Sequence, residues 1–319
     1  LVGSEMCIRD SMGPIDIESF RPETLDKVNR LLELLAEMGR HPDLKGKLAM
    51  HGGTAINLFM FGLPRLSVDI DMSYVGSLSR AEMMRERPGI ERGIQEVASY
   101  LGYRVDAREG GHAGRTFVLR CRGNWGNDHV KIDCIYMNRS PLIPLRVRQS
   151  PLRPDLDVLM FDDYELAGGK VKAYFDRVKI RDLYDIGNLA EHCSGVEAPD
   201  ELLHKVLLYY ASLSAHFPNS FIGRSLRFEK CEKEVEEQLV PMLRQLEKPP
   251  TLDSLMQKAE RFVESFVLPK NDLEKEYLER LSQGDYCPEL LFGDGEVTQR
   301  AAQSPEAQWK LLNLKKMGG

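Results

Sequence analysis

Apolar and polar positions change period several times along the first half of the chain. Residues 23–39 carry apolar side chains at helical spacing and end at a glycine, which predicts a helix. Residues 47–51 form a short apolar run and residues 68–74 alternate with period two, so both segments predict strands. By the same criteria we expect further helices over 55–61 and 79–101, and further strands over 115–120 and 129–136.

The second half of the chain has a different pattern. From about residue 162 to about residue 315 the apolar residues recur at helical spacing, interrupted by prolines. The first half therefore mixes strands with helices, and the second half contains helices only. This order indicates an α+β unit followed by a helical unit. We therefore expect an α+β domain over residues 12–160 and a helical domain over residues 161–319.

The first residues look foreign to the rest of the chain. Segment 4–11 resembles a translated sequencing-adapter fragment, and it lacks the apolar core of a signal peptide. We expect residues 1–11 to be a non-native leader and Met12 to be the first native residue. Residues 1–11 therefore take no part in the predicted fold.

Composition excludes several classes of protein. Of the 319 residues, 42% are hydrophobic and 29% are charged, which is ordinary for a globular protein. No apolar run is long enough to span a bilayer, so we expect no membrane partner. The six cysteines include no C-x-x-C pair, which argues against a zinc ribbon and fits a reducing cytoplasm.

The net charge of -6 restricts how the chain would bind nucleic acid. A surface that is acidic overall needs a local basic patch for contact with a phosphate backbone. Segment 139–154 is the best candidate because it contains no acid and four arginines, namely Arg139, Arg146, Arg148 and Arg153. The alternative is a solvated loop.

Two acids stand two residues apart on the strand predicted over 68–74. Asp69 and Asp71 must leave the same face of that strand side by side. Hard divalent ions such as magnesium take oxygen ligands, and two carboxylates at this spacing can bridge a metal pair that clamps a phosphoryl displacement. The competing interpretation is a solvated strand face. Ser67 lies two residues earlier, so its hydroxyl points towards the same predicted site.

A glycine turn precedes the two acids by about one helix. Gly52 and Gly53 let backbone approach a ligand, and the helix after them offers free N–H groups to a triphosphate. Thr54 would either donate to a phosphate or cap this helix. A third acid, Asp133, lies on the apolar strand predicted over 129–136, where a buried charge requires a partner. That partner would be a metal shared with the first two acids, or a neighbouring lysine or arginine.

Three histidines, His51, His112 and His129, lie near these motifs in the sequence. They show no H-x-x-x-H spacing. Packed or solvated side chains are therefore a better interpretation of them than metal ligands.

Four blocks of sequence occur in order, at 52–56, 65–71, 131–133 and 166–185. Together they resemble the AbiEii/AbiGii toxin family of nucleotidyltransferases, which are abortive-infection and toxin–antitoxin proteins of bacteria related to DNA polymerase β-type transferases. The resemblance covers about residues 45–190. It implies a polymerase-β-like nucleotidyltransferase fold of the α+β class, with a mixed sheet, flanking helices and a helical C-terminal region.

The resemblance also implies roles for individual residues. Lys170 would neutralise triphosphate charge, and Asp182 or Asp185 would position it. Gly168 and Gly169 precede this lysine, so either the helix begins at Gly169 or backbone comes close to the ligand there. The implied catalytic residues are Asp69, Asp71, Asp133, Lys170, Asp182 and Asp185; the implied metal ligands are Asp69, Asp71 and Asp133; and the implied nucleotide-binding residues are Gly52, Gly53, Thr54, Arg65, Ser67, Lys170 and Arg181.

These motifs predict an enzyme that moves a nucleotide from an NTP to an acceptor hydroxyl, with two Mg²⁺ ions, or Mn²⁺, as cofactor. The acceptor would be RNA, at the 3′ end of a tRNA, or a protein side chain. The resemblance implies the toxin of a toxin–antitoxin or abortive-infection system, with a cognate antitoxin as partner.

Two other functions remain open. A non-catalytic nucleotide-binding module is disfavoured by three converging acids. A small-molecule transferase of the antibiotic-modifying kind is disfavoured by the R-D-x-Y-D helix at 181–185.

Overall fold

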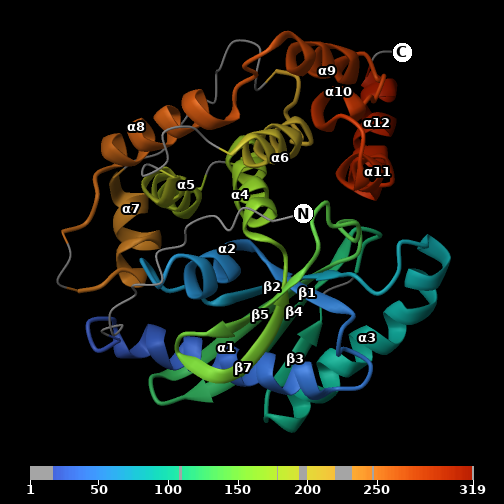
Figure 1. The fold of residues 1–319 in the computed structure, drawn as a ribbon. Coiled ribbons are helices and arrows are strands. Elements are labelled where there is room, and N and C mark those ends of the chain that lie inside the picture. Colours follow the sequence, from blue (N-terminus) through green and yellow to red (C-terminus); the bar gives the residue numbers. More distant parts are fainter. Residues whose placement is uncertain are drawn as a thin grey trace.

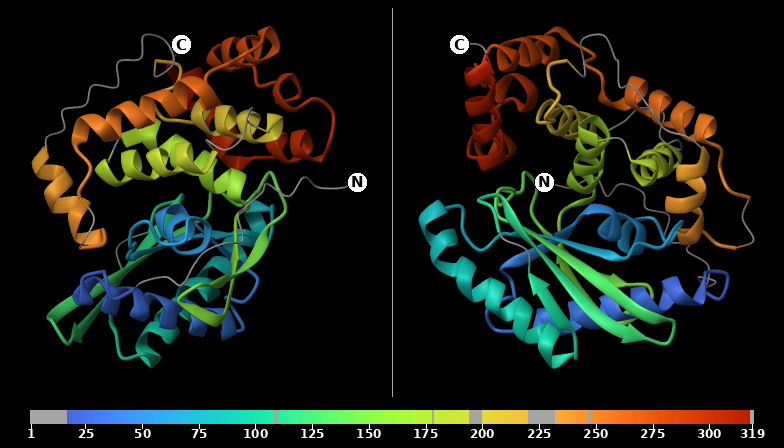
Figure 2. Two further views of the ribbon diagram at one scale, coloured as in Figure 1. Left: turned by 60° about the vertical axis from the view of Figure 1, so that its left-hand side comes forward. Right: turned by 180° about the vertical axis from the view of Figure 1, so that it is seen from behind.

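The computed structural model of the chain describes residues 17–107, 110–177, 179–193, 200–219, 232–245 and 248–317. The expected leader, residues 1–11, lies outside these ranges. A β-sheet with covering helices forms the lower half of Figure 1, and a group of helices forms the upper half. Figure 2 shows the same two parts from the side and from behind. The arrangement agrees with the mixed sheet, flanking helices and helical C-terminal region expected from the sequence.

The described strands form one seven-stranded mixed sheet in the order β3-β4-β5-β2-β1-β7-β6. β2 pairs in parallel with β5 and antiparallel with β1, and β1 pairs in parallel with β7. The other pairs are antiparallel. The sheet therefore places β2 and β5, which carry the three predicted acids, side by side at its centre. The strands are β1 (Leu48–His51), β2 (Asp69–Tyr74), β3 (Arg104–Ala107), β4 (Gly114–Gly123), β5 (Gly126–Ile135), β6 (Arg146–Ser150) and β7 (Arg153–Met160).

Helices α1 (Pro22–Arg40) and α3 (Arg80–Tyr100) cover the lower face of the sheet in Figure 1. α1 buries its apolar residues between 28 and 38 at helical spacing, as the sequence pattern predicted. α3 begins after Ser79, whose hydroxyl accepts a hydrogen bond from the backbone N–H of Glu82. Both helices were expected from the sequence, within one or two residues of their ends.

Further helices lie on the other face of the sheet. α2 (Gly52–Ala55) follows β1 directly and continues as the π-helical segment η1 (Ile56–Met60). α4 (Asp163–Arg177) and α5 (Ile180–Cys193) follow β7, and α4 packs against α2. The helical region expected from about residue 162 onwards therefore begins with two helices, of which α4 lies next to the glycine turn.

The remaining helices complete the upper part of Figure 1. A hydrophobic core runs from the sheet into α4, α5 and α8, and a second one lies among α6 and α9 to α12. The core thus continues across the expected domain boundary after residue 160. No helix of the described ranges has the length and apolar character of a membrane span. These elements are α6 (Glu201–Ser212), α7 (Glu232–Gln238), η2 (Val240–Met242), α8 (Leu252–Phe262), η3 (Val263–Val267), α9 (Asp272–Ser282), α10 (Glu289–Phe292), α11 (Glu296–Ala302) and α12 (Pro305–Met317).

Segment 139–154 is not the free basic patch considered from the sequence. Much of it forms the edge strand β6 and the start of β7. Arg139 is buried and donates to two backbone carbonyls. The other three arginines pair with acids that lie just beyond the segment, which its acid-free sequence did not reveal. The pairs are Arg146–Asp162 at 2.5 Å, Arg148–Asp163, and Arg153–Asp155 at 3.5 Å.

Candidate active site

Neighbouring strands bring a row of polar side chains to one face of the sheet. In the strand register, His51 of β1 lies opposite Asp71 of β2, and Asp71 lies opposite Asp133 of β5. β4 extends the row, because Thr116 lies opposite Asp133. Paired positions share a face of the sheet, and Asp69, two residues before Asp71, shares it too. The three acids therefore lie on adjacent strands, whereas their role as metal ligands stays a prediction.

Gly52 allows the glycine turn to approach Asp71. Its φ of +76° lies in the left-handed region that favours glycine. A Cβ atom at this position would lie 2.2 Å from the Oδ2 atom of Asp71. Any other residue would therefore be strained and would displace the Asp71 carboxylate.

The carboxylate of Asp71 has no ion pair or hydrogen bond with another residue in the described part of the chain. Burial raises the pKa of Asp71; His51 lowers it, while Asp133 and Asp69 raise it further. An ionised carboxylate without a partner is costly here, and a bound cation would remove that cost. Asp69 and Asp71 supply the oxygen ligands that Mg²⁺ prefers, so these two residues fit a divalent ion.

Asp133 has protein partners of its own. Its carboxylate accepts a hydrogen bond from the hydroxyl of Thr116 at 2.5 Å and forms an ion pair with Lys131. Of the two kinds of partner considered from the sequence, the structure shows the lysine. Among the described residues, no group of three or more His, Cys, Asp or Glu side chains is arranged to hold a metal ion. To bind the same ion as Asp71, Asp133 would have to give up its ion pair with Lys131.

Thr54 ties the glycine turn to β2. It does not cap the helix, because the N-cap position is occupied by His51. Its side chain is fully buried, and its hydroxyl contacts the Ser67 hydroxyl at 2.9 Å and donates to the backbone carbonyl of Asp69. Ser67 is buried as well. Thr54 and Ser67 therefore help to fix the position of Asp69, and the nucleotide contact expected of them stays a prediction.

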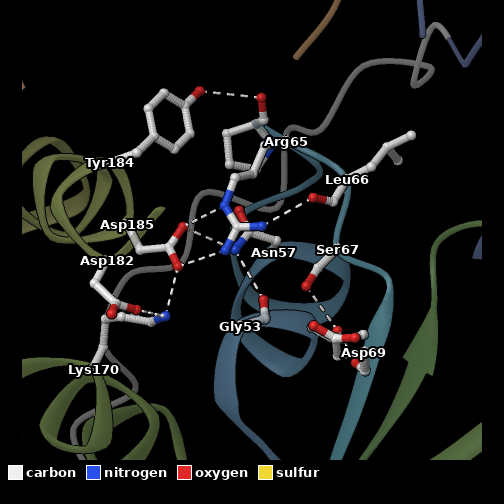
Figure 3. Close-up of polar contacts among 12 residues, drawn as sticks. Gly53, Asn57, Arg65, Leu66, Ser67, Asp69, Lys170, Asp182, Tyr184 and Asp185 are labelled. Atoms are coloured by element: carbon white, nitrogen blue, oxygen red, sulfur yellow. Dashed lines mark hydrogen bonds and ion pairs between the residues drawn. The ribbon is translucent and has the colours of Figure 1, made fainter. Parts of the chain in front are cut away.

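A buried ion-pair network joins α4, α5 and the loop before β2 (Figure 3). Nζ of Lys170 lies 3.0 Å from Oδ1 of Asp182 and 2.8 Å from Oδ2 of Asp185. Arg65 binds Asp185 through two hydrogen bonds, Nε to Oδ1 at 2.8 Å and Nη2 to Oδ2 at 2.7 Å. The amide of Asn57 donates to the same Asp185 carboxylate at 3.1 Å. Both aspartates that were expected to position Lys170 thus contact it.

The charges of this network stabilise one another. Burial disfavours the charged form of each group. At Lys170 the attraction of Asp185 and Asp182 is larger than this effect of burial, and the pKa of Lys170 therefore lies above its usual value. In the same way Lys170 and Arg177 hold the pKa of Asp182 well below its usual range, and Arg65 and Lys170 lower that of Asp185. All these groups are therefore charged at neutral pH, so Lys170 is a fixed cation.

Gly53 lets the network approach the glycine turn. A Cβ atom on Gly53 would lie 3.1 Å from Nη2 of Arg65, 3.5 Å from Oγ of Ser67 and 3.7 Å from Nζ of Lys170. Arg65 is only 2% exposed and lies behind the turn, where it binds Asp185. Arg65 therefore positions Asp185, and the nucleotide contact implied by the resemblance stays a prediction.

Two arginines near the network differ in position. Arg181, which was expected to bind nucleotide, is half-buried on α5, and no hydrogen bond or ion pair involves its side chain within the described ranges. Arg177, at the end of α4, donates from Nε to Oδ2 of Asp182 at 3.1 Å while its side chain stays 53% exposed. Its spacing of seven residues from Lys170 places it on the same face of α4, and this signal was available in the sequence.

Gly168 and Gly169 lie inside α4, which begins at Asp163 rather than at Gly169. A Cβ atom on Gly168 would lie 2.4 Å from Cδ2 of Tyr210, so this glycine permits close packing of α6. No described atom lies within 4 Å of a Cβ atom built on Gly169, which faces a cavity. Gly168 therefore serves helix packing, and Gly169 keeps space open.

A cavity of about 290 Å³ lies between Asp71 of β2 and helix α4. Gly52, Gly53 and Asp71 line it on the sheet side, and Lys170 and Arg177 line it on the helix side. Residues of α6 and α12 complete its wall, which no sequence pattern indicated. Of the three acids in the row, Asp71 lines this cavity, and a carboxylate opposite two cations suits a polyphosphate that carries a metal ion.

His51 also lines this cavity. Its ring packs edge-on against Phe161 with 5.8 Å between centroids, and its Nε2 atom has no hydrogen-bond partner among the described residues. Burial lowers the pKa of His51, and Asp71 only partly offsets this effect. The geometry agrees with the packed histidine expected from the sequence.

Comparisons with known proteins agree with this fold. Residues 33–279 match the family model of the nucleotidyl transferase AbiEii toxin, type IV toxin–antitoxin system. No curated protein matches the chain. MenT4, a nucleotidyltransferase toxin from Mycobacterium tuberculosis H37Rv, has a similar structure with a TM-score of 0.50 and 15% identity, over 92% of this chain and 95% of its own. JHP933 from Helicobacter pylori is similar over 83% of this chain and 97% of its own, with a TM-score of 0.46 and 16% identity.

The structural likeness to MenT4 concerns the fold, and it confirms the predicted mixed sheet with flanking helices and a helical C-terminal region. The family match extends over more than half of the chain and includes the four sequence blocks between residues 52 and 185. The chain therefore belongs to the AbiEii family and is a nucleotidyltransferase toxin of the type IV toxin–antitoxin class.

Proposed function

We propose that this chain transfers a nucleotide from an NTP to an acceptor hydroxyl in a reaction that requires a divalent metal ion. One observation carries the proposal. Asp71 has no protein partner among the described residues, and it lines the same cavity as the fixed cation Lys170. A triphosphate with its metal needs carboxylates on one side and cations on the other.

Asp69 and Asp71 would hold the metal, and Asp133 would join them after releasing Lys131. We propose Mg²⁺, as a pair of ions, and expect Mn²⁺ to substitute because it takes the same oxygen ligands. When bound, the metal offsets phosphate charge and stabilises the attacking and leaving oxygens.

The other residues of the cavity would bind and orient the nucleotide. Backbone at Gly52 and Gly53 has no side chain to keep phosphates away. Lys170 and Arg177 would offset the phosphate charge that the metal leaves, since a triphosphate carries about four negative charges. Because Asp182 contacts both cations, it would keep them in place before substrate binds.

The acceptor hydroxyl belongs to RNA, such as the 3′ end of a tRNA, or to a protein side chain. The four arginines considered for RNA binding already have partners in the chain, so they favour neither acceptor. The type IV toxin–antitoxin assignment of the family leads us to propose a cognate antitoxin as a further partner.

The test is transfer of label from NTPs labelled in the α-phosphate. The purified chain is incubated with each NTP and either total tRNA or a protein mixture, with Mg²⁺ or with EDTA. We expect covalent label on one class of acceptor with Mg²⁺ and none with EDTA. Transfer that is equally fast in EDTA would contradict metal dependence, and the absence of label from both acceptor classes would contradict the proposed reaction.

A further inference from the structure

The cavity extends beyond the edge that faces the glycine turn. An α-helix turns by about 100° per residue, so Lys170 and Lys172 of α4 lie roughly 160° apart around its axis. Both line the cavity, and the arc between them contains Gly169 and Ala173, which have at most a methyl group. The cavity therefore has two polar edges with a flat floor between them.

Lys172 and Glu306 form the second edge. Nζ of Lys172 lies 3.4 Å from Oε1 of Glu306 and 2.6 Å from Oδ2 of Asp176. Asp176 is otherwise satisfied, because its Oδ1 atom accepts from the backbone N–H of Ala215 at 2.6 Å. In the described ranges Glu306 has no hydrogen bond or ion pair besides this long one. Its carboxylate therefore keeps most of its acceptor capacity for a ligand in the cavity.

The position of Glu306 is fixed by the rest of α12. Lys310, one turn further along this helix, is buried and donates to the backbone carbonyls of Ser214 at 2.6 Å and Phe217 at 3.0 Å. These carbonyls lie just beyond the end of α6, so α12 is fastened to α6. Glu306 is a preorganised group of the cavity rather than a mobile surface side chain.

We propose that Lys172 and Glu306 form the nucleobase subsite of this cavity, selective for bases that carry an exocyclic amino group. The inference rests on the proposed function, which assigns the phosphates to the edge at Lys170 and Arg177. The nucleoside then extends across the floor at Gly169 and Ala173, where no side chain obstructs it.

The chemistry of the pair determines which bases fit. A carboxylate only accepts hydrogen bonds and an ammonium group only donates them. The amino groups of adenine, cytosine and guanine would donate to Glu306, while Lys172 donates to a neighbouring acceptor of the base. Uracil presents one ring N–H between two carbonyl oxygens, and these oxygens repel the carboxylate. The pair therefore favours amino-bearing bases over uracil, whose single ring N–H reaches the carboxylate only with a carbonyl oxygen on each side of it.

The test measures the dissociation constants of ATP, CTP, GTP, UTP and inorganic tripolyphosphate, with Mg²⁺ and without acceptor, by calorimetry on the full chain. We expect the wild type to bind its preferred amino-bearing nucleotide about tenfold more tightly than UTP. Glu306→Gln should reduce this ratio to about threefold or less, because the amide can donate to a carbonyl oxygen of uracil. Binding of tripolyphosphate should change less than about twofold, because the base subsite makes no contact with phosphate.

Glu296→Gln is the matched control, because Glu296 is 83% exposed on neighbouring α11 and does not line the cavity. It should keep the wild-type ratio. If Glu306→Gln lowers the melting temperature, Lys172→Met is the second test, since it removes the donor while leaving the side chains of α12 intact. It should narrow the same ratio.

The outcomes separate this inference from the proposed function. A wild type that binds neither nucleotides nor tripolyphosphate would overturn the proposed function. The wild type could bind nucleotides tightly but show no preference over UTP, or Glu306→Gln and Lys172→Met could leave the preference unchanged. Either result would overturn the base subsite and leave the proposed function standing.

Discussion

The Nζ atom of Lys170 lies 2.8 Å from the Oδ2 atom of Asp185, inside the protein and next to the glycine turn. Asp185 is held in turn by Arg65, a residue 120 positions earlier in the chain. This relationship makes the lysine a fixed cation beside the cavity. Its charge is in place before a substrate arrives, which is the condition for electrostatic stabilisation of a transition state.

The first prediction compares Lys170→Ala with Lys172→Ala. Lys170 is the cation of the phosphate edge, so its loss should reduce transfer by about a hundredfold or more. Lys172 lies on the opposite edge, and its loss should cost no more than about tenfold. Initial rates at saturating NTP measure both. Because Lys170→Ala also leaves Asp182 and Asp185 less compensated, rates are compared below the melting temperature of each variant. Equal rates for the two variants would show that Lys170 has no special role.

The second prediction concerns the stability of the buried network. Asp185→Ala leaves Arg65 and Lys170 buried with less compensation, and it should lower the free energy of unfolding by about 3–5 kcal/mol. Asp106→Ala is the control, because its pair with Arg120 is more than half exposed on both sides and should contribute little. Urea unfolding followed by circular dichroism measures both. A loss for Asp185→Ala as small as that of the control would contradict the network.

The same pair gives the network a pH dependence. Arg65 and Lys170 lower the pKa of Asp185 in the folded state, so its contribution to stability is complete above the unfolded pKa of about 4. The contribution is lost as the pH falls below that value towards the folded pKa. The stability difference between wild type and Asp185→Ala should therefore shrink in acid and stay level from about pH 5 upwards.

The third prediction concerns Glu165, which lines the cavity from the other end of α4. Its carboxylate accepts hydrogen bonds from the backbone N–H groups of Leu142 and Ile143 and from the Tyr210 hydroxyl. Burial nevertheless raises its pKa from 4.5 to about 7. The folded state then binds more protons than the unfolded state between these values, so stability falls as the pH rises through this window.

The fall attributed to Glu165 should be on the order of 3 kcal/mol between about pH 4.5 and pH 7, with no further change above. Glu165→Gln should remove it, because the amide does not ionise. Urea unfolding of both proteins at about pH 5 and about pH 7.5 provides the comparison. An identical pH dependence in the two proteins would contradict the shift.

The fourth prediction separates two adjacent glycines. Gly168→Ala places a methyl group 2.4 Å from the Tyr210 ring and should destabilise the protein by about 1–3 kcal/mol. Gly169→Ala meets no described atom within 4 Å and should stabilise α4 by about 0.5–1 kcal/mol, since alanine is the better helix former. Melting temperatures should therefore move in opposite directions, and a shift of the same sign in both variants would refute this packing.

The sequence predicted the central elements well because their patterns are local. The period-two alternation of 68–74 and the glycines before 55–61 were sufficient to place β2 and the turn. The register that sets Asp71 opposite Asp133 was not predictable, because it depends on parallel pairing of strands far apart in the chain. Asp69 and Asp71 were identified correctly as sharing a face, while the contact of Asp133 with Lys131 remained one of two alternatives.

Two features of the fold were missed for different reasons. β6 and β7 lie in and beyond segment 139–154, for which only a basic patch or a solvated loop was considered, although residues 155–160 alternate between exposed and buried in a strand pattern. Glu306 enters the cavity from α12, and nothing in its local sequence distinguishes it from the surface glutamates of the chain. Only the packing of α12 on α6 reveals it.

The central claim is that Asp69 and Asp71 support metal-dependent nucleotide transfer. The most direct test measures the rate of Mg²⁺-dependent label transfer by the variants Asp69→Ala and Asp71→Ala. Each variant should lose at least about a hundredfold in rate, because removing one metal ligand removes several kcal/mol of transition-state stabilisation. Asp106→Ala, an exposed aspartate on β3, should transfer at the wild-type rate. Transfer by Asp69→Ala or Asp71→Ala at the wild-type rate would contradict the assignment of the active site.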